Sequence, residues 1–254
     1  MKKELTDLIL ARLHETKDQC KQDFFQPQTI PVARYFILDK LLPDEIAMEI
    51  YSSFPKPEDM SLLSSPGKIK SKYYHLKDAA SIIQNVLLAT QDPKVVAAIE
   101  DITEIKNQIP DQSTKAGGIS VLTKGYYLNP HLDISHDVES KRYYRTINFL
   151  YYVTPDWKLE NGGNLELWDK DIKKCIIIPS IFNRLVIMET NTRSWHAVNP
   201  VKIKANRCCV FNYYFSEHSP ENKDYVLKGS IFRPRPEQKI RRAICFLKEK
   251  IFSL

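Results

Sequence analysis

The stretch "LNPHLDISHDVESKRYYRTINFLYYVTPDW", residues 128–157, decides the fold because it divides sharply into a polar part and an apolar part. The polar part carries two histidines and two aspartates within seven residues, in a chain that has six histidines in all. The apolar part, residues 144–153, has the length and the β-branched and aromatic residues of a buried strand. Polar side chains beside such a strand either bind a ligand or are the ordinary polar residues of a solvated loop.

The segments around this stretch predict a strand-rich core. From residue 118 to 216, short apolar segments alternate with turn signals at the spacing of a β-sandwich or barrel. The predicted strands are residues 119–128, 144–153, 164–169, 174–179, 184–189, 194–201 and 207–215.

The flanking regions have helical periodicity. Predicted helices lie within residues 1–20, 43–54, 77–90, 92–105 and 236–252, with a short strand within 31–42. The last helix places four apolar residues on one face, namely Ile240, Ile244, Leu247 and Ile251. Residues 61–76, rich in lysine and tyrosine, predict a loop. Its part 68–76 is either a lid over a pocket or a solvated loop, and we favour the loop.

The length of 254 residues, 43% of them hydrophobic, is enough for one structural domain with a sizeable core. We expect three parts within it: an N-terminal helical region (1–117) packed on the core, a β core (118–216), and a C-terminal loop and helix (217–254). The segment "FRPRPEQKIRR", residues 232–242, is either a basic patch for an acidic partner or a helix entrance with solvated charges. We favour solvated charges.

Composition argues against several classes of protein. A run of about 18 apolar residues would be needed for a membrane helix, and the sequence has none. The five cysteines form no C-x-x-C motif and are odd in number, which favours a reducing, cytoplasmic location over a disulfide framework. The net charge of +6 is modest and spread out, so we expect no nucleic-acid partner.

The histidines and aspartates suggest a metal site. On a strand, residues i and i+2 point to one face, so His131 and Asp133 can offer an imidazole and a carboxylate to one metal. His196, within a predicted strand 65 residues later, is the candidate for a third ligand. Two histidines and one carboxylate form the facial triad of non-haem Fe(II) oxygenases. Taken alone, a His-x-Asp pair more often belongs to a solvated loop than to a metal site. A lone histidine is likewise more often a hydrogen-bonded core residue than a metal ligand.

Arg207 strengthens the metal hypothesis. It follows His196 by eleven positions, across the polar turn "KIKAN". If the two strands form a hairpin, the two side chains share a face. A buried guanidinium within "RCCVFNYYF" is costly unless it meets an anion, and its planar fork suits a carboxylate. A metal with an arginine deeper in the same barrel is what a chelating dicarboxylate requires.

The ordered motifs resemble those of the 2-oxoglutarate- and Fe(II)-dependent oxygenases, prolyl hydroxylase-like branch, over residues 118–216. In order they are "PHLD", "YYRTINFLYYVTPDW", "NGGNLELW", "IIIPSIFNRLVIME", "SWHAVNPV" and "NRCCVFNYYF". The resemblance implies a double-stranded β-helix, a cupin-like jelly roll. It also implies Fe(II), 2-oxoglutarate and O2 as cofactor and cosubstrates.

The same resemblance implies roles for single residues. His131, Asp133 and His196 match the iron ligands, and Arg207 matches the arginine that binds the distal carboxylate of 2-oxoglutarate. Tyr152 matches a tyrosine that supports that carboxylate. Two weaker candidates for substrate contact are Asn148, which shares a strand face with Tyr152, and Arg145, which we interpret more readily as a surface arginine paired with Asp137 or Glu139. Gly162 and Gly163 match a structural glycine pair.

The implied reaction hydroxylates an unactivated C–H bond and releases succinate and CO2. The first hypothesis is a hydroxylase of a small molecule, such as an amino acid, a sugar or a natural-product intermediate. The second is a prolyl-type hydroxylase of a protein or peptide. A third, a cupin-like metal-binding module without turnover, is disfavoured by Arg207. Residues 1–100 carry no motif that points to a substrate, and the sequence does not indicate an oligomeric state.

Overall fold

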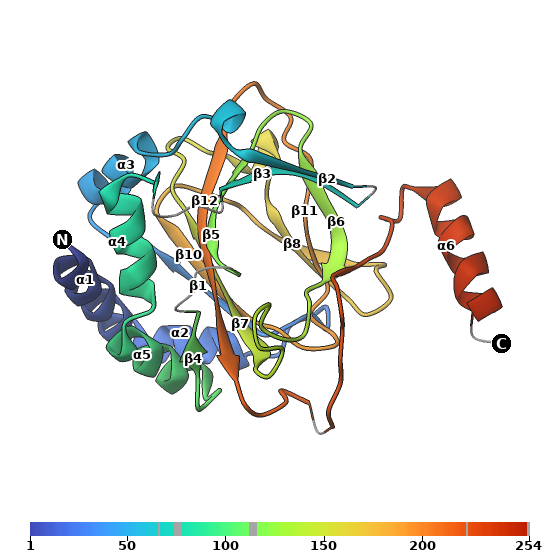
Figure 1. The fold of residues 1–254 in the computed structure, drawn as a ribbon, viewed down its shortest axis with the longest axis horizontal. Coiled ribbons are helices and arrows are strands. Elements are labelled where there is room, and N and C mark those ends of the chain that lie inside the picture. Colours follow the sequence, from blue (N-terminus) through green and yellow to red (C-terminus); the bar gives the residue numbers. More distant parts are fainter. Residues whose placement is uncertain (66, 74–77, 112–115, 222, 253–254) are drawn as a thin grey trace.

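The computed structural model describes residues 1–254 except 66, 74–77, 112–115, 222 and 253–254. Its core is the predicted jelly roll, mainly antiparallel β-structure with helices at its flanks (Figure 1). Hydrogen-bonded neighbours follow the order β1-β10-β7-β12-β5-β3-β6-β11-β8-β9, while β2, β4 and β13 pair with β3, β12 and β6.

The strands are β1 (Tyr35–Asp39), β2 (Ser61–Ser65), β3 (Lys68–Tyr73), β4 (Ile109–Pro110), β5 (Gly118–Leu122), β6 (Tyr127–Leu132), β7 (Tyr144–Tyr152), β8 (Leu165–Trp168), β9 (Cys175–Ile178), β10 (Arg184–Glu189), β11 (His196–Val198), β12 (Arg207–Ser216) and β13 (Ile231–Phe232). The helices are α1 (Lys2–Glu15), α2 (Lys17–Phe25), α3 (Asp44–Ser52), α4 (Ser81–Thr90), α5 (Pro93–Thr103) and α6 (Lys239–Phe252), with short 3-10 turns at η1 (Pro57–Asp59) and η3 (Leu159–Asn161).

One layer, which we call the helix-backed sheet, consists of β1, β10, β7, β12 and β5. Helices α1 to α5 lie against its outer face (Figure 1). Helix α1 buries Leu5, Ile9 and Leu13, spaced four residues apart, in one apolar cluster with Phe149 of β7. Helix α5 begins where the Asp92 carboxylate accepts the Lys94 N–H, a capping interaction that ends the preceding turn. The N-terminal helices therefore buttress this sheet, as predicted.

The second sheet consists of β6, β11, β8 and β9 and faces the first across an apolar cluster between the layers. Strand β3 joins the two sheets, because Lys68 pairs with Leu128 of β6 while Ser71 pairs with Val121 of β5. Residues 61–65 and 68–73 thus form a hairpin, so the predicted loop was wrong. Along strand β3 three lysines alternate with Ile69, Ser71 and Tyr73, and backbone pairing holds it to both neighbours. Residues 66 and 74–76 of the predicted loop lie outside the described residues.

Another expected strand divides in two. Residues 119–128 were predicted as one segment, but β5 ends at Leu122 and β6 begins at Tyr127. The turn between them contains Gly125, whose φ of 84° suits glycine. This break lets the chain leave the helix-backed sheet and enter the second one.

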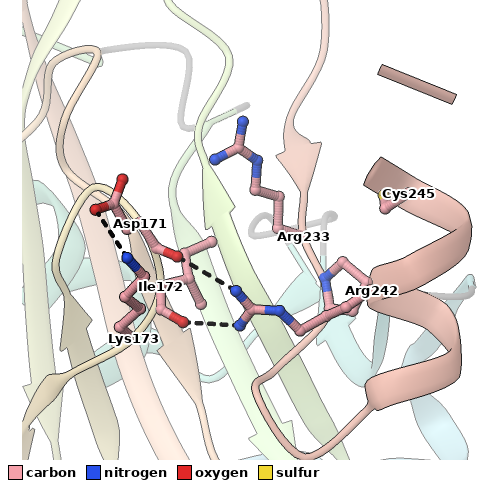
Figure 2. A pocket seen from close by; sticks show the side chains of 7 residues that line it. Asp171, Ile172, Lys173, Arg233, Arg242 and Cys245 are labelled. Atoms are coloured by element: carbon pink, nitrogen blue, oxygen red, sulfur yellow. Dashed lines mark hydrogen bonds and ion pairs between the residues drawn. The ribbon is translucent and has the colours of Figure 1, made fainter. Parts of the chain in front are cut away.

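The C-terminal helix α6 forms as predicted and lies beyond β6, across the molecule from α1 to α5 (Figure 1). Ile240 is 79% exposed and Ile244 is 50% exposed, so this part of the predicted apolar face is not packed on the core. The side chains of Leu247 and Ile251 lie outside those described. Figure 2 shows Arg242 reaching the turn between β8 and β9, where its Nη1 donates to the Ile172 carbonyl at 2.8 Å.

None of the helices in the described part of the chain reaches the length and apolarity that crossing a membrane requires. All five cysteines are free thiols.

Candidate active site

Strands β6 and β11 bring two histidines together. His131 and His196 are directly paired across the two strands, and their ring centroids lie 4.2 Å apart. Directly opposed residues on antiparallel strands share a face of the sheet, which here is the face toward the interior. Both side chains are buried.

Asp133 completes a three-residue cluster. It follows the end of β6, and the alternation expected from His131 still holds across that end. The Nε2 atom of His131 lies 3.8 Å from Oδ1 of Asp133, and Nε2 of His196 lies 3.8 Å from Oδ2. The three donor atoms all lie within 4.8 Å of one another. The structure thus brings together the three residues that the sequence proposed as ligands.

Backbone carbonyls fix the orientation of both imidazoles. Nδ1 of His131 bonds the Asn129 carbonyl and Nδ1 of His196 bonds the Ser194 carbonyl, each at 2.9 Å. Because a carbonyl accepts, each Nδ1 carries the proton in the neutral ring and Nε2 presents a lone pair toward Asp133. Metal bonds of about 2.1 Å allow two ligand atoms to lie up to about 4.2 Å apart, so the 3.8 Å distances fit one ion.

Arg207 reaches the same interior from the helix-backed sheet. The predicted hairpin between β11 and β12 was wrong: β11 pairs with β6 and β8, whereas β12 pairs with β4, β5 and β7. Arg207 and His196 converge because their two sheets face each other. The Arg207 side chain is 3% exposed, and in the described part of the chain its Nε has no hydrogen-bond partner.

A cavity of about 110 Å³ lies between the sheets and joins these groups. Asn148, Leu150 and Tyr152 of β7 all line it, as the alternation along the strand predicted. The Arg207 guanidinium carbon lies 5.3 Å from the Tyr152 ring centroid. Burial raises the pKa of Tyr152, so its hydroxyl keeps its proton and can donate a hydrogen bond.

Arg145 is not the surface residue that we favoured. It is 5% exposed, and its Nη1 lies 3.5 Å from Oδ2 of Asp133. Its guanidinium carbon sits 3.8 Å from the Tyr213 ring centroid. A bulge explains the error, because β12 pairs Tyr214 with Ile147 and then Phe215 with Arg145. The extra residue turns Arg145 to the inner face, which strict alternation could not predict.

Residues 117–215 match the family model described as the 2OG-Fe(II) oxygenase superfamily. This core belongs to the 2OG-Fe(II) oxygenase superfamily. The chain is accordingly an enzyme of the 2-oxoglutarate-dependent dioxygenase class, with Fe(II), 2-oxoglutarate and O2 as its cofactor and cosubstrates.

Solved structures show the same fold. A prolyl-4-hydroxylase from Pseudomonas putida has 13% identity, covers 82% of this chain and 98% of its own, and gives a TM-score of 0.56. A Trichoplax adhaerens prolyl hydroxylase, in complex with a hypoxia inducible factor peptide, has 17% identity, coverages of 82% and 93%, and a TM-score of 0.55. HygX from Streptomyces hygroscopicus, with nickel, 2-oxoglutarate and hygromycin B bound, has 11% identity, coverages of 73% and 84%, and a TM-score of 0.50.

Among the residues that line the oxygenase cavity, sequence reasoning did not single out Tyr213, Lys68 or Phe232. Tyr213 shares the inner face of β12 with Arg207, so alternation along that strand could have found it. Its hydroxyl bonds Asp133, and burial followed by the Asp133 charge raises its pKa, so it remains a donor. Lys68 and Phe232 line the cavity from β3 and β13, and no local pattern marks them.

Other groups from the quoted stretch lie apart from the cavity. Nδ1 of His136 bonds the Ser135 hydroxyl at 2.7 Å, and the Asp137 carboxylate accepts backbone N–H groups of its own loop. Gly162 and Gly163 have positive φ, as their structural role requires. A Cβ at Gly162 would lie 2.0 Å from the Pro200 carbonyl oxygen.

Proposed function

We propose that this oxygenase hydroxylates an unactivated C–H bond of a small molecule, such as an amino acid, a sugar or a natural-product intermediate. In this proposal His131, Asp133 and His196 hold Fe(II). Arg207 and Tyr152 hold the distal carboxylate of 2-oxoglutarate. The observation that carries the proposal is the buried guanidinium of Arg207, which opens onto the same cavity as the three-donor cluster.

The protein contributes position and charge to this chemistry. When bound, Fe(II) and 2-oxoglutarate supply the oxidation of the C–H bond, with succinate and CO2 as by-products. Arg207 offers a bidentate charge-assisted interaction, and the protonated Tyr152 hydroxyl offers a neutral donor beside it. Asp133 keeps the third ligand position as a carboxylate, which favours hydroxylation, since related halogenases lack that carboxylate.

The shape of the site supports a small substrate. The cavity is narrow, and β3 bridges β5 and β6 by backbone pairing, which occupies an edge that a peptide strand would otherwise use. Lys68 of that strand and Phe232 of β13 flank the cavity, with the Lys68 ammonium 5.7 Å from the Phe232 ring centroid. A cytoplasmic location remains a prediction from cysteine usage.

The alternative is a protein or peptide hydroxylase. The peptide-bound Trichoplax enzyme shares the fold, as does HygX with hygromycin B bound, so the likeness supports either class. Arg145 would be the substrate contact in the alternative. Its engagement with Asp133 and Tyr213 supports a role inside the site instead.

The test is an anaerobic titration of 2-oxoglutarate into the Fe(II)-loaded protein, followed by metal-to-ligand charge-transfer absorbance. Arg207→Ala removes a buried charge pair of about 2–5 kcal/mol, which corresponds to an affinity loss of about 30-fold to several thousandfold. Arg207→Lys should recover part of the loss, because a point charge cannot reproduce the guanidinium fork. Iron affinity should stay unchanged in both variants.

Arg34→Ala is the matched control. The Arg34 guanidinium pairs with Glu189 at 2.7 Å, away from the cavity, and its removal should leave 2-oxoglutarate affinity unchanged. Equal affinities of wild type and Arg207→Ala would contradict the assigned cosubstrate site.

A further inference from the structure

The C-terminal strap, residues 230–238, lies along β6 and reaches the cavity. Phe232 pairs with His131 in the ladder between β13 and β6, and the two rings stack with centroids 4.8 Å apart and planes 18° apart. The Arg233 N–H donates to the Pro130 carbonyl at 2.8 Å. Gln238 accepts from the Asn129 side chain at 3.2 Å. The strap therefore follows the strand that carries the first histidine.

The two histidine strands are joined by an irregular ladder. His131 pairs with His196 and Leu128 pairs with Val198, so three residue steps on β6 stand opposite two on β11. Such a bulge interrupts regular hydrogen bonding and changes the direction of side chains. The relative orientation of the two imidazole rings therefore depends on the geometry of this bulge.

Arg235 of the strap bridges the bulge. Its Nη2 donates to the carbonyls of Leu128 and Val198, both at 3.0 Å, which are the two residues paired at the far end of the bulge. Its Nη1 donates to Oε2 of Glu166 on β8. One guanidinium therefore joins three neighbouring strands of the second sheet.

This arrangement is buried and charged. Arg235 and Glu166 are each 5% exposed, and Glu166 also accepts from the Trp168 indole at 3.0 Å. Leu165 and Leu167 face the cluster between the sheets, so the alternation of β8 directs Glu166 to the outer face. The expectation of solvated charges in residues 232–242 was wrong for Arg235, because its partners come from strands 37 to 107 residues away.

We propose that Arg235 is a positioning residue for the metal site, acting through the β6–β11 bulge on the two histidines. The inference rests on the proposed metal-binding role of His131 and His196. In it, the strap is part of the active site although none of its side chains is a ligand. Removal of Arg235 should let the bulge relax and misdirect the imidazoles, which lowers metal affinity.

The experiment measures Co(II) affinity by visible absorbance, without 2-oxoglutarate, in the full-length chain. Arg235→Met leaves Glu166 as a buried charge without its cation, so a loss of stability alone could weaken binding. The double variant Glu166→Met, Arg235→Met removes both charges and restores an apolar contact. We expect the double variant to fold, although the Leu128 and Val198 carbonyls and the Trp168 indole lose a partner. It should bind Co(II) about 10- to 100-fold more weakly.

Arg34→Met, which removes the ion pair with Glu189, is the control for loss of an arginine pair elsewhere and should bind Co(II) like wild type. Wild-type Co(II) affinity in a folded double variant would overturn the inference. Should the double variant fail to fold, the Arg235→Lys variant decides between the outcomes. Lysine keeps a cation for Glu166 but cannot span both carbonyls. Unchanged Co(II) affinity in this variant would likewise overturn the inference. If wild type binds Co(II) but not 2-oxoglutarate, the proposed function fails while this test stands.

Discussion

The outer faces of the two sheets of the jelly roll are covered differently. The helix-backed sheet, which carries Arg207 and Tyr152, is covered by helices in a continuous apolar cluster. The second sheet, which carries His131 and His196, is extended at β6 by the strap strand β13 and braced on its outer face by the charged pair of Arg235 and Glu166. Apolar packing is non-directional, whereas hydrogen bonds fix direction. The difference teaches that the sheet which aims the metal ligands adds directional contacts to its apolar packing.

The largest effect should come from the candidate ligands on the side of the second sheet. His131→Ala, His196→Ala and Asp133→Asn should each reduce Fe(II)-dependent succinate formation by more than the ~100-fold that outer-shell changes reach. Asparagine is chosen at position 133 because it keeps an oxygen toward the buried Arg145. Urea unfolding should show a cooperative transition for each variant, which establishes that the variants are folded. Retained succinate formation in any of the three would remove that residue from the ligand set.

A large loss of stability should come from the helix-backed sheet. Phe149 of β7 is fully buried in the helix-packed cluster, so Phe149→Ala should lower the free energy of unfolding by about 3–5 kcal/mol. Phe232→Ala, on the second sheet, removes a partly exposed ring and should cost less than about 2 kcal/mol. Urea unfolding of both variants measures the contrast. Equal losses in the free energy of unfolding would show that apolar burial stabilises the two sheets to the same extent.

The smallest effect should come from the loop that carries the chain from the second sheet to the helix-backed one. Burial alone would raise the pKa of Asp137, but N–H groups of Tyr143, Ser140 and Arg142 hold it below its ordinary value. Because the pKa of Asp137 is lower in the folded protein than its ordinary value of 3.8, the carboxylate stabilises the folded state at pH values above 3.8. This stabilisation is lost as the pH falls through the folded-state pKa. Asp137→Asn should therefore cost about 1 kcal/mol at pH 7 and nothing in strong acid.

Urea unfolding at the two pH values checks this difference, with the exposed Asp156→Asn as control. A cost that persists unchanged in acid would mean that the carboxylate charge does not organise the loop.

Much of the β core could be predicted because its strands bury alternating apolar residues. The strand 184–189 has the predicted bounds, and the inner face of β7 follows from its alternation. Arg207 was placed near His196 on the assumption of a hairpin, but the two converge across facing sheets. Burying an unpaired guanidinium is unfavourable whatever the strand connection. The prediction that Arg207 meets an anion therefore did not depend on the hairpin.

The remaining features depend on distant partners. Strand β3 alternates lysines with Ile69, Ser71 and Tyr73, but this short pattern does not say which strands it joins, so its pairing with β5 and β6 could not be predicted. Arg145 reaches the site through a bulge, which shifts the strand by one residue. Arg235 stands in a sequence typical of solvated helix ends, and its burial follows from carbonyls of β6 and β11. Local patterns carry no information on such contacts.

The strap has a consequence for the order in which the protein is made. Synthesis runs from the N-terminus, so both histidine strands leave the ribosome before Arg235, which lies 107 residues after Leu128. Until that arginine emerges, the bulge between β6 and β11 has no brace. Strand β12 of the helix-backed sheet also follows both histidine strands, and the strap is synthesised after β12, so we expect full metal affinity only once Arg235 is in place.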